Sequence, residues 1–195
     1  ENGRRFESDL VVHGAGRSAD IDGLELDRAG VEASRQGIVV DERMQTTNPE
    51  IYAVGDCAAT VQLARVADAE AHAAAADIVG IVQGTGRASR MDYTAVPAVL
   101  FTYPQYAMVG ATEQELVEAG VAFEKSERDH LDWPTYRRVG MHSAAYKVMV
   151  AKDGGLILGA HILSDSATGL INTFTMAMRN GIPVAELHRQ GVMTP

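Results

Sequence analysis

The feature that most constrains the fold lies near residue 55, where a short apolar run meets a long alanine-rich stretch. Ile51-Tyr52-Ala53-Val54 is continuously apolar, which is typical of a strand buried on both faces. Gly55-Asp56 follows, and from Ala58 to about Val82 the chain has no proline. The apolar positions of this stretch recur at helical spacing, at Leu63, Ala67, Ala71, Ala74 and Ile78. We therefore predict a strand, a turn and a long helix with a small-residue face.

The turn of this junction is a candidate ligand site. Ligands of open α/β sheets bind at the carboxyl ends of strands, and helix N-termini offer free N–H groups. Asp56 could accept hydrogen bonds from ligand hydroxyls, or it could simply cap the following helix. Cys57 is next to it, and we interpret this lone cysteine as a wall residue and not as a nucleophile.

The remainder of the first half predicts two further strands, at residues 6–12 and 37–41, and a turn at 46–50. Residues 84–90 read as a linker. We therefore place a domain boundary there, with domains at residues 1–90 and 91–195.

The second half alternates short strands with two helices. Strands are predicted at residues 96–101, 107–110, 121–124, 146–150 and 156–161. Thr112-x-x-Glu115 is a capping box that opens a helix over 113–119, and a longer helix is predicted over 165–180. Asp153-Gly154 indicates a hairpin turn. The order predicts an antiparallel sheet with helices on one face, so the fold class is α+β: an α/β segment followed by this sheet-plus-helix domain.

Composition excludes several function classes. The chain has 195 residues and a formal net charge of −9, which argues against binding to nucleic acid. Its single cysteine excludes an internal disulfide framework, and its histidines show no paired metal-ligand spacing, so we predict no metal site; His161 reads as a hydrogen-bonded core residue. No apolar run is long enough to span a bilayer and no signal peptide is visible, so we expect a cytoplasmic protein.

The string Thr46 to Asp56 resembles the second FAD-binding motif of the pyridine nucleotide–disulfide oxidoreductases, a family that includes dihydrolipoamide dehydrogenase, glutathione reductase and mercuric reductase. Further segments are similar to the family in the same order. They are Asp9–Val12 with Gly16-Arg17, Leu24-x-Leu26 with Gly30-Val31, Leu63-Ala64, Val96–Pro104, Val109–Glu113, Lys147-Val148 and Leu158–His161. One such motif would be weak evidence, whereas several in register are strong.

The resemblance implies a role for individual residues. Asp56, after Gly55, would hydrogen-bond the ribityl chain of FAD. The amide of Ala64, next to Leu63, would point at the O2 side of the flavin, helped by the helix dipole. Val99 would lie near the nicotinamide of NAD(P)H. Residues 1–90 would be the end of the NAD(P) domain and the C-terminal part of the FAD domain, and residues 91–195 would form the dimerisation domain of a homodimer.

When the chain is compared with this family, several of the family's features are absent from it. The redox cysteine pair and the first dinucleotide fingerprint would lie before Glu1, so we assign no catalytic residue and expect a piece of a longer enzyme. The position of the family's catalytic His-Pro pair falls on Thr194-Pro195, so in this register a threonine replaces the usual catalytic histidine and the parent would not reduce disulfides in the usual way. We expect the piece alone to bind FAD weakly or not at all and to have no activity. The alternative hypothesis is a cofactor-free dimerisation module.

Overall fold

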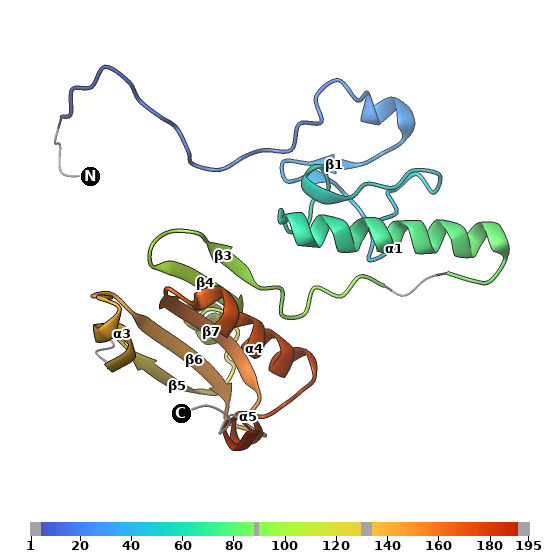
Figure 1. The fold of residues 1–195 in the computed structure, drawn as a ribbon. Helices are drawn as coiled ribbons and strands as arrows, with labels where there is room; N and C mark the ends of the chain where they lie inside the picture. The colour runs from blue at the N-terminus through green and yellow to red at the C-terminus, as the bar shows by residue number, and fades with distance from the viewer. Residues whose placement is uncertain (1–4, 88–89, 130–133, 191–195) are drawn as a thin grey trace. The chain divides into compact units, whose positions relative to one another are not determined.

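The chain divides into two compact units, residues 1–91 and 92–195 (Figure 1). The structure is a computed structural model, and it describes residues 5–87, 90–129 and 134–190. Helices and antiparallel strands occur together, which confirms the α+β fold class. None of the helices in these described ranges is long and apolar enough to cross a membrane.

The first unit is built on one long helix and a small hairpin. Its elements are η1 (Leu26–Ala29), β1 (Ala33–Ser34), β2 (Gly37–Ile38), η2 (Gly55–Cys57) and α1 (Ala64–Gln83). The hairpin strands β1 and β2 pair antiparallel. A small apolar cluster fills the space beside them, formed by Val31, Ile38, Ala53 and Ala58.

Helix α1 begins six residues later than the sequence predicts. Residues 57–59 pair with β2 instead: Ile38 and Ala58 form a parallel bridge, and the Ala59 N–H donates to the Ile38 carbonyl at 2.8 Å. Gly37 permits this close approach, because a Cβ there would lie 2.6 Å from the Cys57 carbonyl oxygen. The buried positions of α1 also differ from the predicted stripe. They are Val66, Glu70, Ala74, Asp77 and Gly80.

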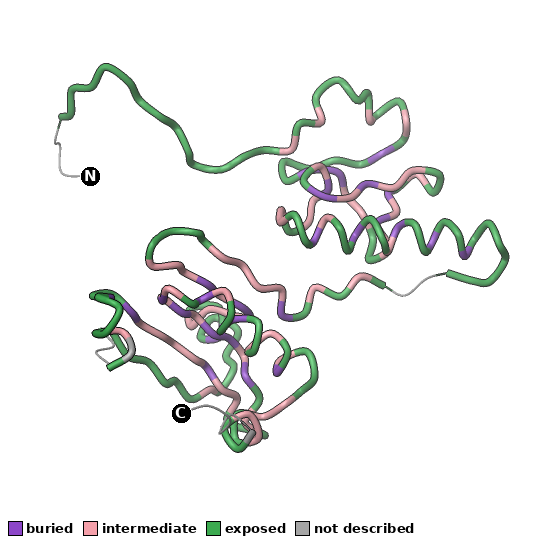
Figure 2. The backbone as a smooth tube through the Cα atoms, in the orientation of Figure 1, coloured by how far each residue is buried: buried purple, intermediate pink, exposed green. Residues whose placement is uncertain are grey.

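Two of the strands predicted in this unit do not form. Residues 6–12 are extended but unpaired, and Phe6, Leu10, Val11 and Val12 are largely exposed (Figure 2). Residues 51–54 make only one bridge, between Tyr52 and Gln45. An apolar run forms a strand only where neighbouring backbone pairs with it over several residues. Residues 51–53 pair with residues 44–46 around this single bridge, and within the described ranges no strand pairs with residues 6–12.

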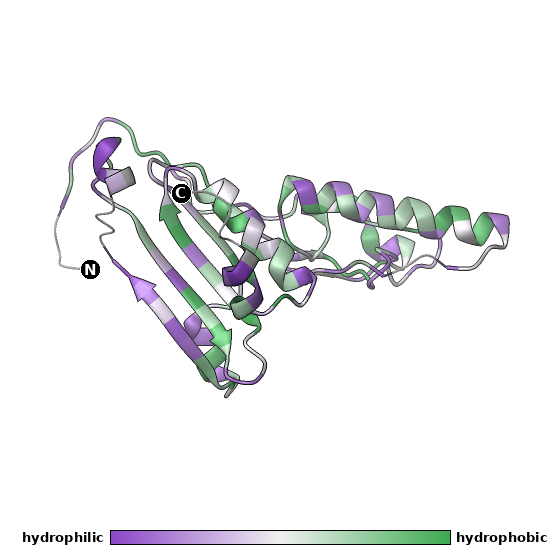
Figure 3. Cartoon of the chain, turned by 60° about the horizontal axis from the view of Figure 1, so that its bottom comes forward, coloured by the Kyte–Doolittle hydropathy of each residue, from purple (hydrophilic) through white to green (hydrophobic). Residues whose placement is uncertain are grey.

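The second unit is a five-stranded antiparallel sheet in the order β3-β4-β7-β6-β5. Its strands are β3 (Ala98–Leu100), β4 (Gln105–Gly110), β5 (Phe123–Arg128), β6 (Ala145–Ala151) and β7 (Ile157–Ser164). The edge strand β5 is mostly exposed and hydrophilic (Figure 3), which protects a free sheet edge from pairing with other chains. Along the other strands, successive side chains point to opposite faces of the sheet.

Helices lie against both faces of this sheet, so the prediction of a one-sided arrangement is wrong. Helix α4 (Ala167–Arg179) packs on β4 and β7 over a core that includes Val109, Ala160 and Ile171. Helix α2 (Glu113–Glu118) lies on the other face, where Glu113 contacts Lys147 of β6. Its capping box is formed as predicted. Two short helices, α3 (Pro134–Arg138) and α5 (Val184–Gln190), complete the unit.

Candidate functional site

The Gly55-Asp56 turn is held against α1 by close packing. Gly55 is buried and has φ +72°, a left-handed conformation that favours glycine. A Cβ at Gly55 would lie 3.2 Å from the Cβ of Ala67, which belongs to the first turns of α1. Ala53, two residues earlier, is buried and its N–H donates to the Met44 carbonyl at 3.1 Å. The end of the apolar run is therefore fixed from both sides.

The Asp56 side chain points outward and does not cap α1. Its carboxylate forms an ion pair with Arg17 at 3.1 Å, and the Asp56 side chain is 52% exposed. The N-cap of α1 is Leu63, which provides no side-chain hydrogen bond. The capping alternative for Asp56 is therefore wrong, and its carboxylate remains accessible to a ligand.

The N-terminus of α1 lies close to this turn in the sequence and is exposed. Ala64 is the first helical residue and is exposed, whereas Leu63 is half-buried. The first turn contains no acidic residue. The backbone N–H groups at the start of a helix have no partner within the helix, so this end can donate hydrogen bonds to a ligand and carries a partial positive charge.

A cavity of about 590 Å³ lies beside the turn. Arg17, which pairs with Asp56, is one of its lining residues, and Gln62, which also lines it, donates from Nε2 to the Asp56 carbonyl at 3.3 Å. The Oγ1 atom of Thr60 is buried and has no hydrogen-bond partner in the part of the chain that the structure describes. The full lining is Arg17, Ser18, Ala19, Arg35, Gln36, Thr60 and Gln62. Two guanidinium groups and an unsatisfied hydroxyl suit a ligand that carries both anionic and hydroxyl groups.

Two buried carboxylates on α1 were not anticipated from the sequence. Glu70 and Asp77 are both fully buried. The Gly55 N–H donates to Glu70 Oε2 at 2.7 Å, which links α1 directly to the candidate site. Glu70 and Asp77 lie at helical spacing with the buried Val66 and Ala74, and this spacing is the signal for their burial in the sequence. A charged residue within an alanine-rich helix is nevertheless more often exposed to solvent.

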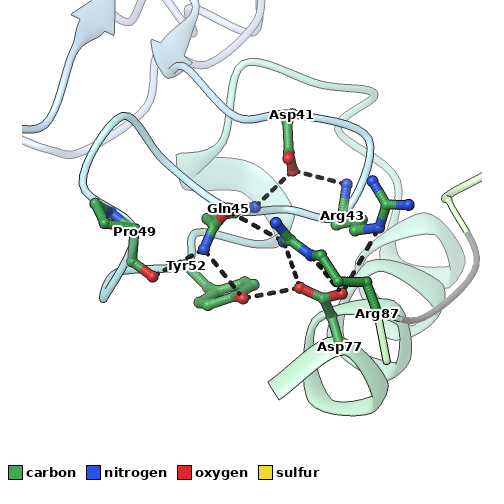
Figure 4. Close-up of polar contacts among 7 residues, drawn as sticks. All are labelled: Asp41, Arg43, Gln45, Pro49, Tyr52, Asp77 and Arg87. Atoms are coloured by element: carbon green, nitrogen blue, oxygen red, sulfur yellow. Dashed lines mark hydrogen bonds and ion pairs between the residues drawn. The ribbon is translucent and has the colours of Figure 1, made fainter. Parts of the chain in front are cut away.

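Asp77 fixes the C-terminal half of α1 to the loop before the site (Figure 4). Its carboxylate accepts from the Tyr52 hydroxyl at 2.9 Å and from Arg87 at 2.6 Å and 3.1 Å, with Arg43 at 3.6 Å. Burial, followed by this hydrogen bond to Asp77, raises the pKa of Tyr52 above its ordinary value. The cluster therefore holds the segment before the Gly55-Asp56 turn against α1.

The remaining residues singled out by the sequence lie elsewhere. Val99 is in β3 of the second unit, where it packs against the apolar core under α4. Cys57 is half-buried and contacts the Val54 carbonyl through Sγ at 3.3 Å. His161 is half-buried, with Nδ1 at 3.0 Å from the Tyr106 hydroxyl, so it is hydrogen-bonded as predicted. Thr194-Pro195 lies outside the described residues.

No group of three or more His, Cys, Asp or Glu side chains within the described ranges is arranged to hold a metal ion. The second unit has a cavity of about 690 Å³ between α2 and the sheet. Glu113 is at its side, and hydrogen bonds from Lys125 and Lys147 lower the pKa of this carboxyl to about 2. The Glu113 carboxylate and the ammonium groups of Lys125 and Lys147 therefore neutralise one another's charge.

Comparison with known proteins gives two matches to family profiles. Residues 1–71 match the profile described as pyridine nucleotide-disulphide oxidoreductase, and residues 96–195 match the dimerisation domain of the same proteins.

Several individual proteins are similar to the chain. An uncharacterized 19.7 kDa protein in the mercuric resistance operon of Staphylococcus aureus is 35% identical, with 84% of this chain and 90% of that protein covered. Dihydrolipoyl dehydrogenase 2 of Arabidopsis thaliana is 33% identical over 89% of this chain and 33% of its own length. Mycothione reductase of Mycobacterium tuberculosis is 30% identical, with 97% and 41% covered.

The fold is similar to that of a solved enzyme. The HOCl-induced flavoprotein disulfide reductase RclA from Escherichia coli superimposes with a TM-score of 0.77 and 26% sequence identity. The match covers 92% of this chain and 40% of that protein. The chain thus spans about two fifths or less of the named enzymes and most of the staphylococcal protein.

Proposed function

Since the chain belongs to the pyridine nucleotide–disulfide oxidoreductase family, we propose that it forms one wall of the FAD site and the dimerisation domain of an FAD-dependent NAD(P)H oxidoreductase. The observation that carries this proposal is the outward carboxylate of Asp56. It is half-exposed beside a polar cavity and has no role as the cap of α1. A carboxylate kept accessible at a rigid turn is suited to binding a polyhydroxyl chain.

The residues around the turn fit FAD by their chemistry. Asp56 would accept hydrogen bonds from ribityl hydroxyls, and the N–H group of Ala64 would donate to the flavin O2 side with Leu63 beside it. Because Gly55 has no side chain, the backbone of the turn can pass close to Ala67 of α1. Arg17 and Arg35 would neutralise phosphate charge, and the orphaned Thr60 Oγ1 could bond a ligand oxygen. Bound FAD would supply two-electron chemistry between NAD(P)H and an acceptor.

We extend the proposal to the whole parent enzyme. The match of residues 96–195 to a dimerisation domain supports a homodimer formed through residues 91–195. Val99, half-buried in β3, is our candidate for contact with the nicotinamide of NAD(P)H. The lone free Cys57 is compatible with a reducing, cytoplasmic compartment. We assign no catalytic residue to this chain, and the substrate is a small molecule.

The test is Asp56→Ala in the parent enzyme, with flavin content measured by absorbance near 450 nm after dialysis. Loss of a hydrogen bond to a charged acceptor should weaken FAD binding by about 10- to 100-fold. Asp68→Asn is the control, because Asp68 is an exposed carboxylate on α1 that pairs only with the exposed Arg65 in the described contacts. Equal flavin retention by Asp56→Ala and wild type would contradict the proposal.

The staphylococcal relative favours a second candidate function, because this chain spans 90% of that protein's length. A protein of this size could act as a cofactor-free dimerisation module. The two candidates differ in one property of the chain itself, which is whether FAD contacts the Gly55-Asp56 turn.

A further inference from the structure

Glu70 is an unusual residue for its position, because a charged carboxylate lies fully buried on the packed face of α1. Removing a carboxylate from water is costly unless strong hydrogen bonds compensate. One such bond is identified: the Gly55 N–H donates to Glu70 Oε2 at 2.7 Å. A hydrogen bond to an ionised acceptor is shorter and stronger than one between neutral groups. The Glu70 carboxylate therefore binds the backbone of the turn that presents Asp56.

The geometry gives this bond a positioning effect. Gly55 is held at φ +72°, and its Cα faces the Ala67 side chain one turn before Glu70 on the helix. Helix α1 therefore contacts the turn at two points, one apolar and one polar. With the Gly55 N–H directed inward, the next residue, Asp56, keeps its side chain outward beside Arg17.

We propose that Glu70 is the positioning residue of the candidate flavin site, and that its carboxylate fixes the Gly55 amide so that Asp56 remains turned toward a ligand. This inference rests on the proposed function for the meaning of Asp56. Its test requires no FAD. Failure of the positioning role and failure of the flavin proposal can therefore be told apart.

The experiment measures amide hydrogen exchange and chemical shifts in the ¹⁵N-labelled 195-residue chain. Glu70→Leu removes the acceptor at similar size, and Glu70→Gln retains an acceptor oxygen without the charge. Asp77→Asn is the matched control, because Asp77 is equally buried two turns later on the same helix and, in the described contacts, binds the side chains of Tyr52, Arg43 and Arg87.

We expect Gly55 amide exchange about tenfold faster or more in Glu70→Leu, with a smaller increase in Glu70→Gln. In Glu70→Gln the Gly55 amide proton should also shift upfield, because its bond is no longer charge-assisted. Because Asp77 holds Tyr52, three residues before Gly55, Asp77→Asn should accelerate Gly55 exchange only as much as that of neighbouring amides, and less than the Glu70 variants do. If Glu70→Leu fails to fold, the Glu70→Gln shift decides alone.

Two results would overturn the proposal. The first is an unchanged Gly55 amide shift in Glu70→Gln. The second is acceleration of Gly55 exchange by Asp77→Asn to the same degree as by the Glu70 variants, which would indicate general destabilisation of α1 and no specific hold on the turn.

Discussion

At the scale of single residues, α1 carries two buried carboxylates with different duties. Glu70 binds the backbone of the Gly55-Asp56 turn. Asp77 instead binds the side chain of Tyr52, which precedes the turn, and that of Arg87, which follows α1. Each compensates the cost of burial through short bonds. The bonds of Glu70 and Asp77 hold the backbone at and before the turn, and so determine where the exposed Asp56 lies. Neither of the two buried residues lies at the surface where a ligand would bind.

Tyr52 should give the first unit a pH dependence in the alkaline range. Its pKa is raised by burial and by the bond to Asp77, so the neutral phenol is favoured in the folded state. Stability is then fully present below the ordinary value of 10.0 and is lost as the pH rises through the raised value. We expect Tyr52→Phe to lose less stability than wild type between about pH 9 and pH 11, measured by urea unfolding.

Tyr103→Phe is the control for this measurement, because Tyr103 is 81% exposed in the other unit. A wild-type profile that is parallel to that of Tyr52→Phe across the whole range would show that Tyr52 does not titrate differently in the folded state.

At the scale of elements, the sheet of the second unit is joined to α2 by a charged cluster. Glu113 accepts from Lys125 of β5 at 2.8 Å and from Lys147 of β6 at 2.7 Å. Glu127 of β5 contacts the same two lysines. The cluster connects one helix and two strands, so its protonation affects the packing of all three.

We expect Glu113 to make the second unit sensitive to acid. Its pKa falls to about 2 from an ordinary value of 4.5, chiefly through the two lysine hydrogen bonds. The stability it contributes is present above pH 4.5 and is lost as the pH falls toward 2. Glu113→Gln should therefore be less stable than wild type at pH 7, and the difference should shrink in this acid range.

Thermal unfolding at a series of pH values measures this effect. Glu118→Gln on the same helix is the control, since Glu118 accepts only from the neutral Gln114 in the described contacts. A constant difference between wild type and Glu113→Gln from pH 7 to pH 2 would contradict the expectation.

Elements that depend on local chemistry are predictable from this sequence. The Thr112–Glu115 capping box and the Asp153-Gly154 turn between β6 and β7 form where the residues indicate them, because each depends on neighbours close in the chain. Residues 6–12 and 51–54 fail as strands because strand formation depends on a distant pairing partner. The helical spacing of Glu70 places it on the buried stripe of α1, but the burial of a carboxylate also depends on the backbone amide that it meets, and the spacing does not identify that amide.

At the scale of the whole molecule, the two units have different proposed roles. Residues 1–91 contain the candidate flavin residues Gly55, Asp56, Leu63 and Ala64, and residues 92–195 contain the match to the dimerisation domain together with Val99, the nicotinamide candidate. This division predicts that dimerisation does not require FAD or the first unit.

Light scattering tests this division. We expect the chain to have twice the 20.8 kDa mass of one copy at micromolar concentration, and the segment 92–195 to remain dimeric. A dimer of the chain but a monomer of the segment would mean that the first unit contributes to the interface. A monomeric chain would remove the homodimer from the proposal.

The most direct test of the central claim is an FAD titration of the ¹⁵N-labelled chain up to millimolar concentration, followed by amide chemical shifts. NMR detects the weak binding expected of an incomplete site. We predict shifts at Gly55, Asp56, Leu63 and Ala64 that are strongly reduced in Asp56→Ala. FAD-dependent shifts at other residues, such as those lining the cavity between α2 and the sheet, with none at these four residues would contradict the flavin assignment.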